Sequence, residues 1–212
     1  MKKSVIAYLV IGILVVSTMT GCVTIVKEGE EASLLSSGSV EDSISLADRW
    51  ESTILPGLKE KAVDLSGFLK EAGGDISSLA EKYGKRTQAD SAVSFTVKGT
   101  AEVVDINTES RAGYLEVKLD NYGGSEIIKL QIGPVFKGTA VRDSSDDIRF
   151  EDYTNQVDYA EVSKEIHDII SETIISQGDM ETLKGKTIEF EGCFTLDKNE
   201  EIVITPINIV EK

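Results

Sequence analysis

Two positively charged side chains, Lys137 and Arg142, lie close together in a chain that is otherwise strongly acidic. The chain holds 22 Lys and Arg against 37 Asp and Glu, a formal net charge of -15 at pH 7. Two cations in one short loop could bind a carboxylate or a hydroxyl-rich ligand. The segment QIGPVFKGTAVRD and the residues after it are therefore a candidate binding site. Its residues are Gly133, Pro134, Lys137, Gly138, Thr139, Arg142, Asp143, Asn155 and Gln156.

A second interpretation of the same loop is purely structural. Arg142 would then pair with a nearby acid, Asp143, Asp146 or Asp152, and hold the loop in place. The helix expected after the loop also needs an N-terminal cap from this region. The candidates for this cap are Asp152, Thr154 and Asn155.

Catalytic chemistry finds little support in the sequence. His167 is the only histidine and lies beside Asp168 in a helical pattern, where a surface or boundary position is expected. The chain has no Gly-x-Ser-x-Gly motif, no phosphate-binding loop and no His-Glu-x-x-His motif. Cys193 is expected to be a small packed side chain rather than a reactive thiol. We therefore expect no enzyme activity and no cofactor.

One acidic run has the beginning of a calcium-binding loop. Asp143, Ser145 and Asp147 have the spacing of the first three ligands of an EF-hand loop. Ile148 stands where that loop needs glycine, and Thr154 stands where it needs a bidentate glutamate. The sequence thus predicts no metal site.

The first residues of the chain have the organisation of a secretion signal. A basic pair precedes an apolar run from Val5 to Val16, which is too short for a good membrane span. The run leads to Met-Thr-Gly-Cys, ending at Cys22, which resembles the lipobox of bacterial lipoprotein signal peptides. This resemblance implies a signal peptide over residues 1–21 and a diacylglycerol thioether, with further acylation such as palmitate, on Cys22. Such an anchor would hold the chain at the cell membrane, on its extracytoplasmic face.

Cleavage would make the mature chain still more acidic. Residues 1–21 contain two lysines and no acids, so 20 basic and 37 acidic side chains remain, a formal charge of -17. Such a surface repels phosphate backbones, and nucleic-acid binding is therefore not expected. With Cys22 lipidated, Cys193 has no partner for an intramolecular disulfide. We expect a monomer stabilised by packing.

Composition and periodicity separate a tether from a helical region. Residues 22–41 are rich in Gly, Ser and Glu and show no sustained period, as expected of a flexible tether. Residues 42–91 carry apolar side chains at helical spacing, with Trp50 among them, and predict a small helical domain. Within it, Pro56 is expected to break or kink the first helix, and Asp75 to cap a later one.

Residues 92–212 predict a second domain, because the apolar period changes from helical to alternating. Gly99 is expected at a bend or bulge of the first strand, and Pro206 at an edge or bulge of the last. A long helix with Ile166 and Ile170 on one face lies between the third and fourth strands. This order is that of an OB-like five-stranded β-barrel, and the fold class is α+β. The strands are expected near residues 93–103, 115–119, 128–132, 188–196 and 202–210.

A series of short segments is spread in a fixed order over roughly residues 45–195. They are Trp50 with Leu55-Pro56, KAVDL (61–65), KYGKR (82–86), VKG (97–99), QIGPV (131–135), GTAVRD (138–143) and NQ (155–156). Together they resemble a family of predicted bacterial periplasmic lipoproteins, domain of unknown function 2291. The resemblance implies a helical domain followed by an OB-like barrel. It also implies an association with sugar-type ABC transporter components, beside which members of the family are often encoded.

Three classes of function follow from these observations. The first is a non-catalytic accessory or binding lipoprotein, associated with a sugar-type ABC uptake system through a transporter component or its solute. The second is a free-standing lipoprotein that binds a sugar or another small solute. The third is an envelope hydrolase, for which the sequence shows no recognisable pair of nucleophile and base. A two-lobed solute receptor is not expected, since the chain is too short and has the wrong order of elements.

Overall fold

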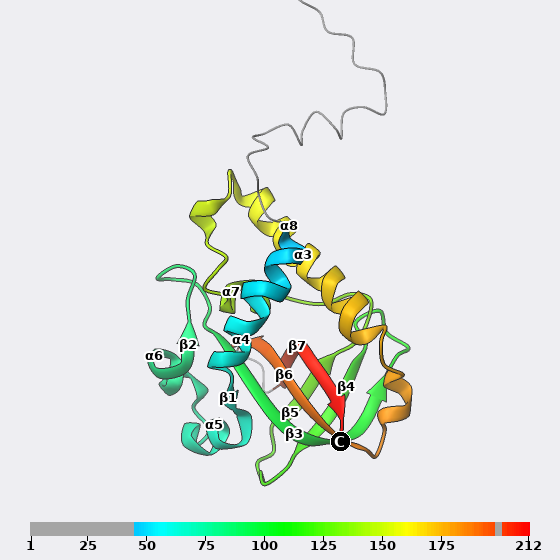
Figure 1. Cartoon of the computed structure of the whole chain (residues 1–212). Helices are drawn as coiled ribbons and strands as arrows, with labels where there is room; N and C mark the ends of the chain where they lie inside the picture. Colours follow the sequence, from blue (N-terminus) through cyan, green and yellow to red (C-terminus); the bar gives the residue numbers. More distant parts are fainter. Residues whose placement is uncertain (1–44, 198–200) are drawn as a thin grey trace, which may run out of the picture. The chain divides into compact units, whose positions relative to one another are not determined.

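The computed structural model describes residues 45–197 and 201–212. The expectations for the signal peptide, for Cys22 and for the tether concern residues outside these ranges. Five strands form the centre of the described structure (Figure 1). They are β3 (Ser94–Asn107), β4 (Tyr114–Leu119), β5 (Ile127–Gln131), β6 (Thr187–Thr195) and β7 (Glu201–Glu211).

These strands close into a barrel because the long strand β3 pairs with two neighbours. Its second half pairs antiparallel with β4, and a stretch from Ser94 to Glu102 pairs antiparallel with β6. The circle continues from β4 to β5, then in parallel to β7, and back to β6. The long helix α8 (Gln156–Ile170) lies in the chain between β5 and β6. The predicted OB-like five-stranded barrel is thus confirmed.

Two irregularities bend the barrel strands. The β3–β4 register shifts between Val103 and Asp105, and the β6–β7 register shifts where Pro206 enters the ladder. The prediction for Pro206 is confirmed. Of the bend or bulge expected at Gly99, the bulge is excluded, since Gly99 pairs regularly with Phe190. A Cβ at position 99 would lie 3.1 Å from the Phe190 ring, so this glycine makes room for a core side chain.

The first helical stretch runs without interruption through three segments. They are α3 (Leu46–Arg49), the π-helical turn η2 (Trp50–Ile54) and α4 (Leu55–Lys61). Pro56 was expected to break or kink this helix, and the helix is not broken there, since helical residues continue from Leu46 to Lys61. Proline is tolerated in the first turn of a helix, and here it lies at the start of α4, directly after the wider π-helical turn.

The chain then forms several short elements beside the barrel. Gly73 ends α5 in the left-handed conformation at φ 56°, and Asp75 caps the next turn by accepting from the Ser77 N–H, as predicted. The two short strands pair with β3, in parallel for β1 and antiparallel for β2. The elements are β1 (Val63–Asp64), α5 (Leu65–Ala72), η3 (Ile76–Leu79), α6 (Ala80–Tyr83) and β2 (Gly84–Lys85).

After β5 the chain forms α7 (Ala140–Ser144), a short helix within the segment that was expected to be a loop. The turns η4 (Phe150–Asp152), η5 (Ser171–Ile175) and η6 (Met180–Leu183) flank α8. None of the helices in the described ranges is long and apolar enough to cross a membrane.

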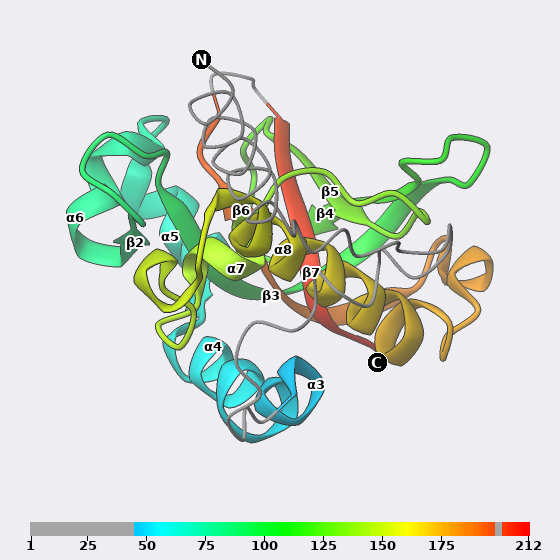
Figure 2. The ribbon, with the colours of Figure 1, turned by 90° about the horizontal axis from the view of Figure 1, so that it is seen from above.

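Two hydrophobic clusters stabilise the fold. One fills the barrel, where Phe95 and Phe194 stack at 5.2 Å and Phe68 of α5 packs against both rings. The other lies outside the barrel and joins Trp50, whose predicted core position is confirmed, to Ile166 of α8. The helical segment therefore shares both clusters with the barrel, and residues 44–212 form one compact unit (Figure 2). The change near residue 91 is a change of secondary structure within this unit.

Candidate functional site

Close backbone packing and a side-chain amide hold the predicted loop in place. A Cβ on Gly133 would lie 2.1 Å from the Gly113 nitrogen, so only glycine fits. Gly138 has a φ of 83°, a conformation that L side chains rarely adopt. The buried amide of Gln131 accepts from the Lys137 N–H at 2.7 Å and donates to the Lys137 carbonyl at 3.1 Å. The loop is thus built by its backbone, while the Lys137 side chain is exposed.

Arg142 is almost buried and binds groups of the chain itself. Its Nε and Nη2 atoms both lie 2.8 Å from Oδ1 of Asp143. Its Nη1 atom donates to the Tyr159 carbonyl at 3.1 Å, and its guanidinium lies 3.9 Å from the centre of the Tyr159 ring. Thr139 donates to the other oxygen of Asp143. The Arg142–Asp143 pair is the one that the structural interpretation anticipates.

The remaining residues of the predicted site lie at the start of α8 or on the loop surface. Asn155 caps α8, since its side-chain oxygen accepts from the N–H groups of Val157 and Asp158 at 2.8 and 3.0 Å. Gln156 is the first residue of the helix, and both Gln156 and Pro134 are exposed. The structure therefore brings Thr139, Arg142 and Asp143 into one cluster, and leaves the other polar side chains of the predicted site outside it.

The two side chains considered for catalysis are packed. His167 stacks on Phe136 with ring centres 5.2 Å apart, and burial lowers its pKa. Cys193 is fully buried, and burial raises its pKa to about 11 despite the nearby hydroxyls of Thr96 and Ser144. Cys193 is thus a packed side chain, as expected. Within the described ranges no group of three or more His, Cys, Asp or Glu side chains is placed to hold a metal ion.

A polar hollow of about 220 Å³ lies between α4, β2, β3 and the end of α7, and sequence reasoning did not find it. We call it the lysine hollow. Lys61 ends α4 and Lys85 ends β2, so two elements that are distant from α7 in the sequence each contribute a cation. The residues that line it are Lys61, Tyr83, Gly84, Lys85, Ser94, Thr96, Ser144 and Asp146.

The two ammonium groups converge on one carboxylate. Lys61 Nζ lies 3.0 Å from Oδ2 of Asp146, and Lys85 Nζ lies 2.9 Å from Oδ1. Each lysine also donates to a backbone carbonyl at the end of α7, Lys61 to that of Ser144 and Lys85 to that of Ser145. Burial alone would raise the pKa of Asp146, but the hydrogen bonds from Lys85 and Lys61 outweigh burial and lower it. Within the described ranges, no other carboxylate binds two lysines.

Buried hydroxyl groups line the floor of the lysine hollow. Ser94 Oγ lies 3.0 Å from Thr195 Oγ1, and Thr96 Oγ1 lies 3.6 Å from the Cys193 sulfur. Ser144 is 1% exposed, and the only hydrogen-bonding partner of its hydroxyl within the described residues is the adjacent Cys193 thiol. A thiol is a weak hydrogen-bonding group, so the Ser144 hydroxyl is only weakly satisfied by the chain itself.

The position of Lys85 depends on a close approach of two backbones. A Cβ on Gly84 would lie 2.3 Å from the Val93 side chain and 2.6 Å from the Ala80 carbonyl oxygen. Glycine therefore lets β2 reach β3 directly after α6. Lys61 and Lys85 lie in the segments KAVDL and KYGKR, and their charge in an acidic chain was the available signal for this site.

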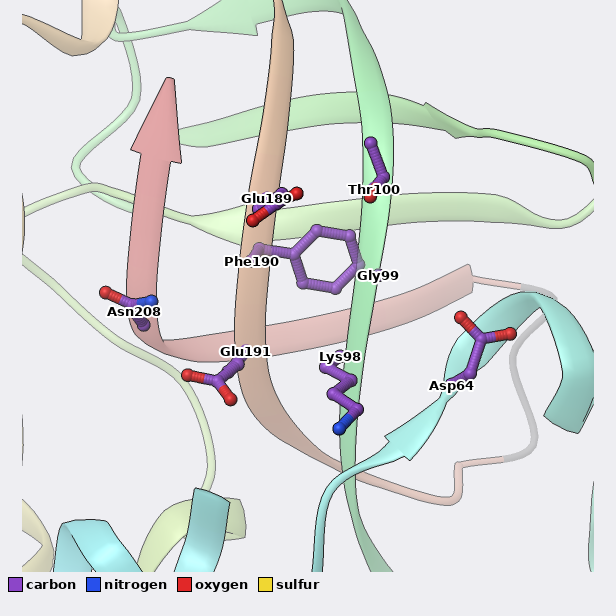
Figure 3. Close-up of a pocket in the computed structure, with 8 residues that line it drawn as sticks. All are labelled: Asp64, Lys98, Gly99, Thr100, Glu189, Phe190, Glu191 and Asn208. Carbon is purple, nitrogen blue, oxygen red and sulfur yellow. The ribbon is translucent and has the colours of Figure 1, made fainter. Parts of the chain in front are cut away.

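A shallower hollow of about 370 Å³ lies on the outer face of β3, β6 and β7 (Figure 3). Lys98 lies there between Asp64 and Glu191, and Glu191 also pairs with Lys59 at 3.3 Å. The Phe190 ring is 1% exposed and offers a ligand almost no stacking surface. Three carboxylates and one lysine line this hollow, and its hydrogen-bonding groups resemble those of an ordinary solvated sheet face.

A larger and mostly apolar cavity of about 650 Å³ lies at one end of the barrel. Aliphatic side chains of α5, η3 and the strand ends line it, among them Leu69, Ile76 and Ile202. We therefore take the lysine hollow as the candidate site, because buried polar groups and fixed charges converge there.

Comparisons with known proteins agree with this architecture. An OB-fold protein from Thermotoga maritima, known from a crystal structure, is similar with a TM-score of 0.59 and 18% sequence identity. The match covers 77% of this chain and 97% of that one, and at this identity it shows the fold alone. No relative was found among curated proteins. A family model described as predicted periplasmic lipoprotein (DUF2291) matches residues 12–210, and the chain belongs to this family.

Proposed function

We propose that the chain is a non-catalytic binding lipoprotein, anchored through Cys22 on the extracytoplasmic face of the membrane. It acts as an accessory of a sugar-type ABC uptake system and binds a transporter component or its solute. Membership in a family of predicted periplasmic lipoproteins supports the compartment. The residues before Cys22 support the anchor.

The lysine hollow is the observation that supports binding rather than catalysis. Some hydrolases use a serine as nucleophile and a lysine as base, and Ser144 and Lys61 both line the hollow. Here the hydrogen bonds of Lys61 are directed at Asp146 and the backbone, and no hydrogen bond joins it to the Ser144 hydroxyl. The hollow therefore offers fixed donors and acceptors to a ligand without an activated nucleophile.

Affinity purification of the lipidated chain from detergent-solubilised membranes tests this function. A component of a sugar-type ABC transporter should co-purify with the wild-type chain. The chain with Cys22→Ser should lose both its membrane fraction and this component. Recovery of the wild-type chain without any transporter component would contradict the accessory role.

A free-standing solute binder is the second candidate, and the same hollow supports it. In that case a sugar or related solute should raise the melting temperature of the purified mature chain, although no transporter component co-purifies. The two experiments together separate the candidates. Hydrolysis of a chromogenic ester or glycoside that is lost in Ser144→Ala would instead support the hydrolase.

A further inference from the structure

We infer that the lysine hollow binds a small hydroxylated anion, such as a sugar acid or a sugar phosphate. The carboxylate or phosphate group would take the place of the Asp146 carboxylate at Lys61 and Lys85, with the ligand's hydroxyl groups toward the serine and threonine side chains that line the hollow. This inference rests on the proposed binding role and names the ligand class of its site.

Unused hydrogen-bond donors support the anion part of the inference. An ammonium group has three N–H donors. Lys61 uses two of them on the Ser144 carbonyl and on Asp146, and Lys85 uses two on the Ser145 carbonyl and on Asp146. The two side chains are 30% and 28% exposed, so solvent reaches them. One donor on each lysine is therefore open to an oxygen of a ligand.

Local charge favours an anion over a cation at this place. Lys61, Lys85 and Asp146 together carry a charge of about +1, in a chain whose formal charge is -15. The two lysines already donate to the two oxygens of one carboxylate, that of Asp146, so their spacing fits a planar acid group. Its side chain is 74% exposed, so it can turn toward solvent when a ligand arrives.

The dimensions and walls of the hollow favour a small hydroxylated ligand. Its volume of about 220 Å³ lies below the roughly 300–1000 Å³ of pockets for drug-sized molecules. A hydroxyl group both donates and accepts, and the hydroxyl side chains of Ser94, Thr96 and Ser144 line the hollow. Tyr83 adds an aromatic side chain to the rim. The Ser144 hydroxyl, bound only weakly by the Cys193 thiol, adds a further polar group to the wall of the hollow.

Titration calorimetry on the full mature chain with Cys22→Ser, which removes the lipid, tests this inference. The probes are gluconate, glucose 6-phosphate, inorganic phosphate and neutral glucose. Gluconate or glucose 6-phosphate should bind in the millimolar range or tighter, and more tightly than glucose. Preference for inorganic phosphate over both would overturn the requirement for hydroxyl groups. Absence of binding by every probe at millimolar concentration would overturn the inference.

Three variants locate the site. Lys61→Met and Lys85→Met should each weaken anion binding about tenfold or more, because each removes a charge-assisted hydrogen bond. Lys59→Met is the matched control, since Lys59 lies on the same helix and pairs with Glu191 outside the hollow. Equal loss in the control variant would overturn the site.

The anion affinity of Asp146→Asn separates a binding site from ion pairs that only stabilise the fold. This measurement remains informative if the lysine variants fold poorly. Removing the competing carboxylate should tighten anion binding roughly threefold to tenfold. Unchanged or weaker anion binding in this variant would contradict the site. Co-purification of a transporter component is measured separately, so loss of the ligand does not decide the accessory role.

Discussion

The guanidinium of Arg142 lies 3.9 Å from the ring centre of Tyr159 and donates a hydrogen bond to the carbonyl oxygen of the same residue. This contact joins α7 to the first turns of α8. The guanidinium of Arg142, a candidate for ligand recognition in the loop, is thus bound by groups of the chain itself. Arg142 therefore braces the loop, and the recognition that we propose involves Lys61 and Lys85 instead.

Arg142→Ala should lower the free energy of unfolding by about 1–3 kcal/mol, because it leaves Asp143 without its cation and removes the contact with Tyr159. The unfolding free energy of Arg142→Lys should lie between those of wild type and Arg142→Ala. Lysine keeps the positive charge but lacks the planar guanidinium group, which can donate two parallel hydrogen bonds. Urea denaturation of the three proteins measures both values. An unchanged unfolding free energy together with lost partner binding would restore the loop as the recognition site.

Asn155→Ala should cost about 1 kcal/mol of stability, because two N–H groups at the start of α8 lose their acceptor. Gln156→Ala is the matched control, as Gln156 is exposed and makes no capping hydrogen bond in the structure. It should change stability by less than about 0.5 kcal/mol. Equal losses in the two variants would show that the cap is not the cause.

Cys193 should not react with a thiol reagent in the folded protein at mildly alkaline pH. Burial raises its pKa to about 11, and its side chain is inaccessible. Labelling should appear only with denaturant, and the melting temperature should not depend on reductant. Rapid labelling of the native chain with Cys22→Ser would contradict the packed position.

The ion pairs of Asp146 predict a loss of stability in acid. The pKa of Asp146 in the folded state lies below its ordinary value of 3.8, so the pairs contribute above that value. The contribution is lost as the pH falls through the folded pKa. Melting temperatures measured from neutral pH down to about pH 3 should fall less steeply in Asp146→Asn than in wild type. Parallel curves would mean that these pairs do not affect stability.

The barrel could be predicted because the residue patterns that specify its strands lie within short segments of the sequence. Alternation along segments such as 115–119 and 188–196 specifies one buried face for each strand, and the helix between the third and fourth strands specifies the order. The cap at Asp75 and the cap at Asn155, one of three candidates, are likewise set by neighbours in the sequence. These predictions held because they did not depend on tertiary packing.

The lysine hollow could not be predicted in this way. Lys61, Lys85 and Asp146 come from three separate segments, and only the docking of α4 and β2 beside α7 brings them together. The continuation of the helix through Pro56 could not be predicted for a related reason, since the π-helical turn before it is not visible in a residue pattern. Gly99 marked a close contact with the core ring of Phe190 rather than a bulge.

Mass spectrometry of small molecules released from the natively purified mature chain tests the central claim most directly. The wild-type chain should release a hydroxylated anion in an amount comparable with the protein. The double variant Lys61→Met and Lys85→Met, purified in parallel, should release much less of it, while Lys59→Met should match the wild type. Release of no such molecule from the wild-type chain, or of equal amounts from the double variant, would contradict a binding role for the lysine hollow.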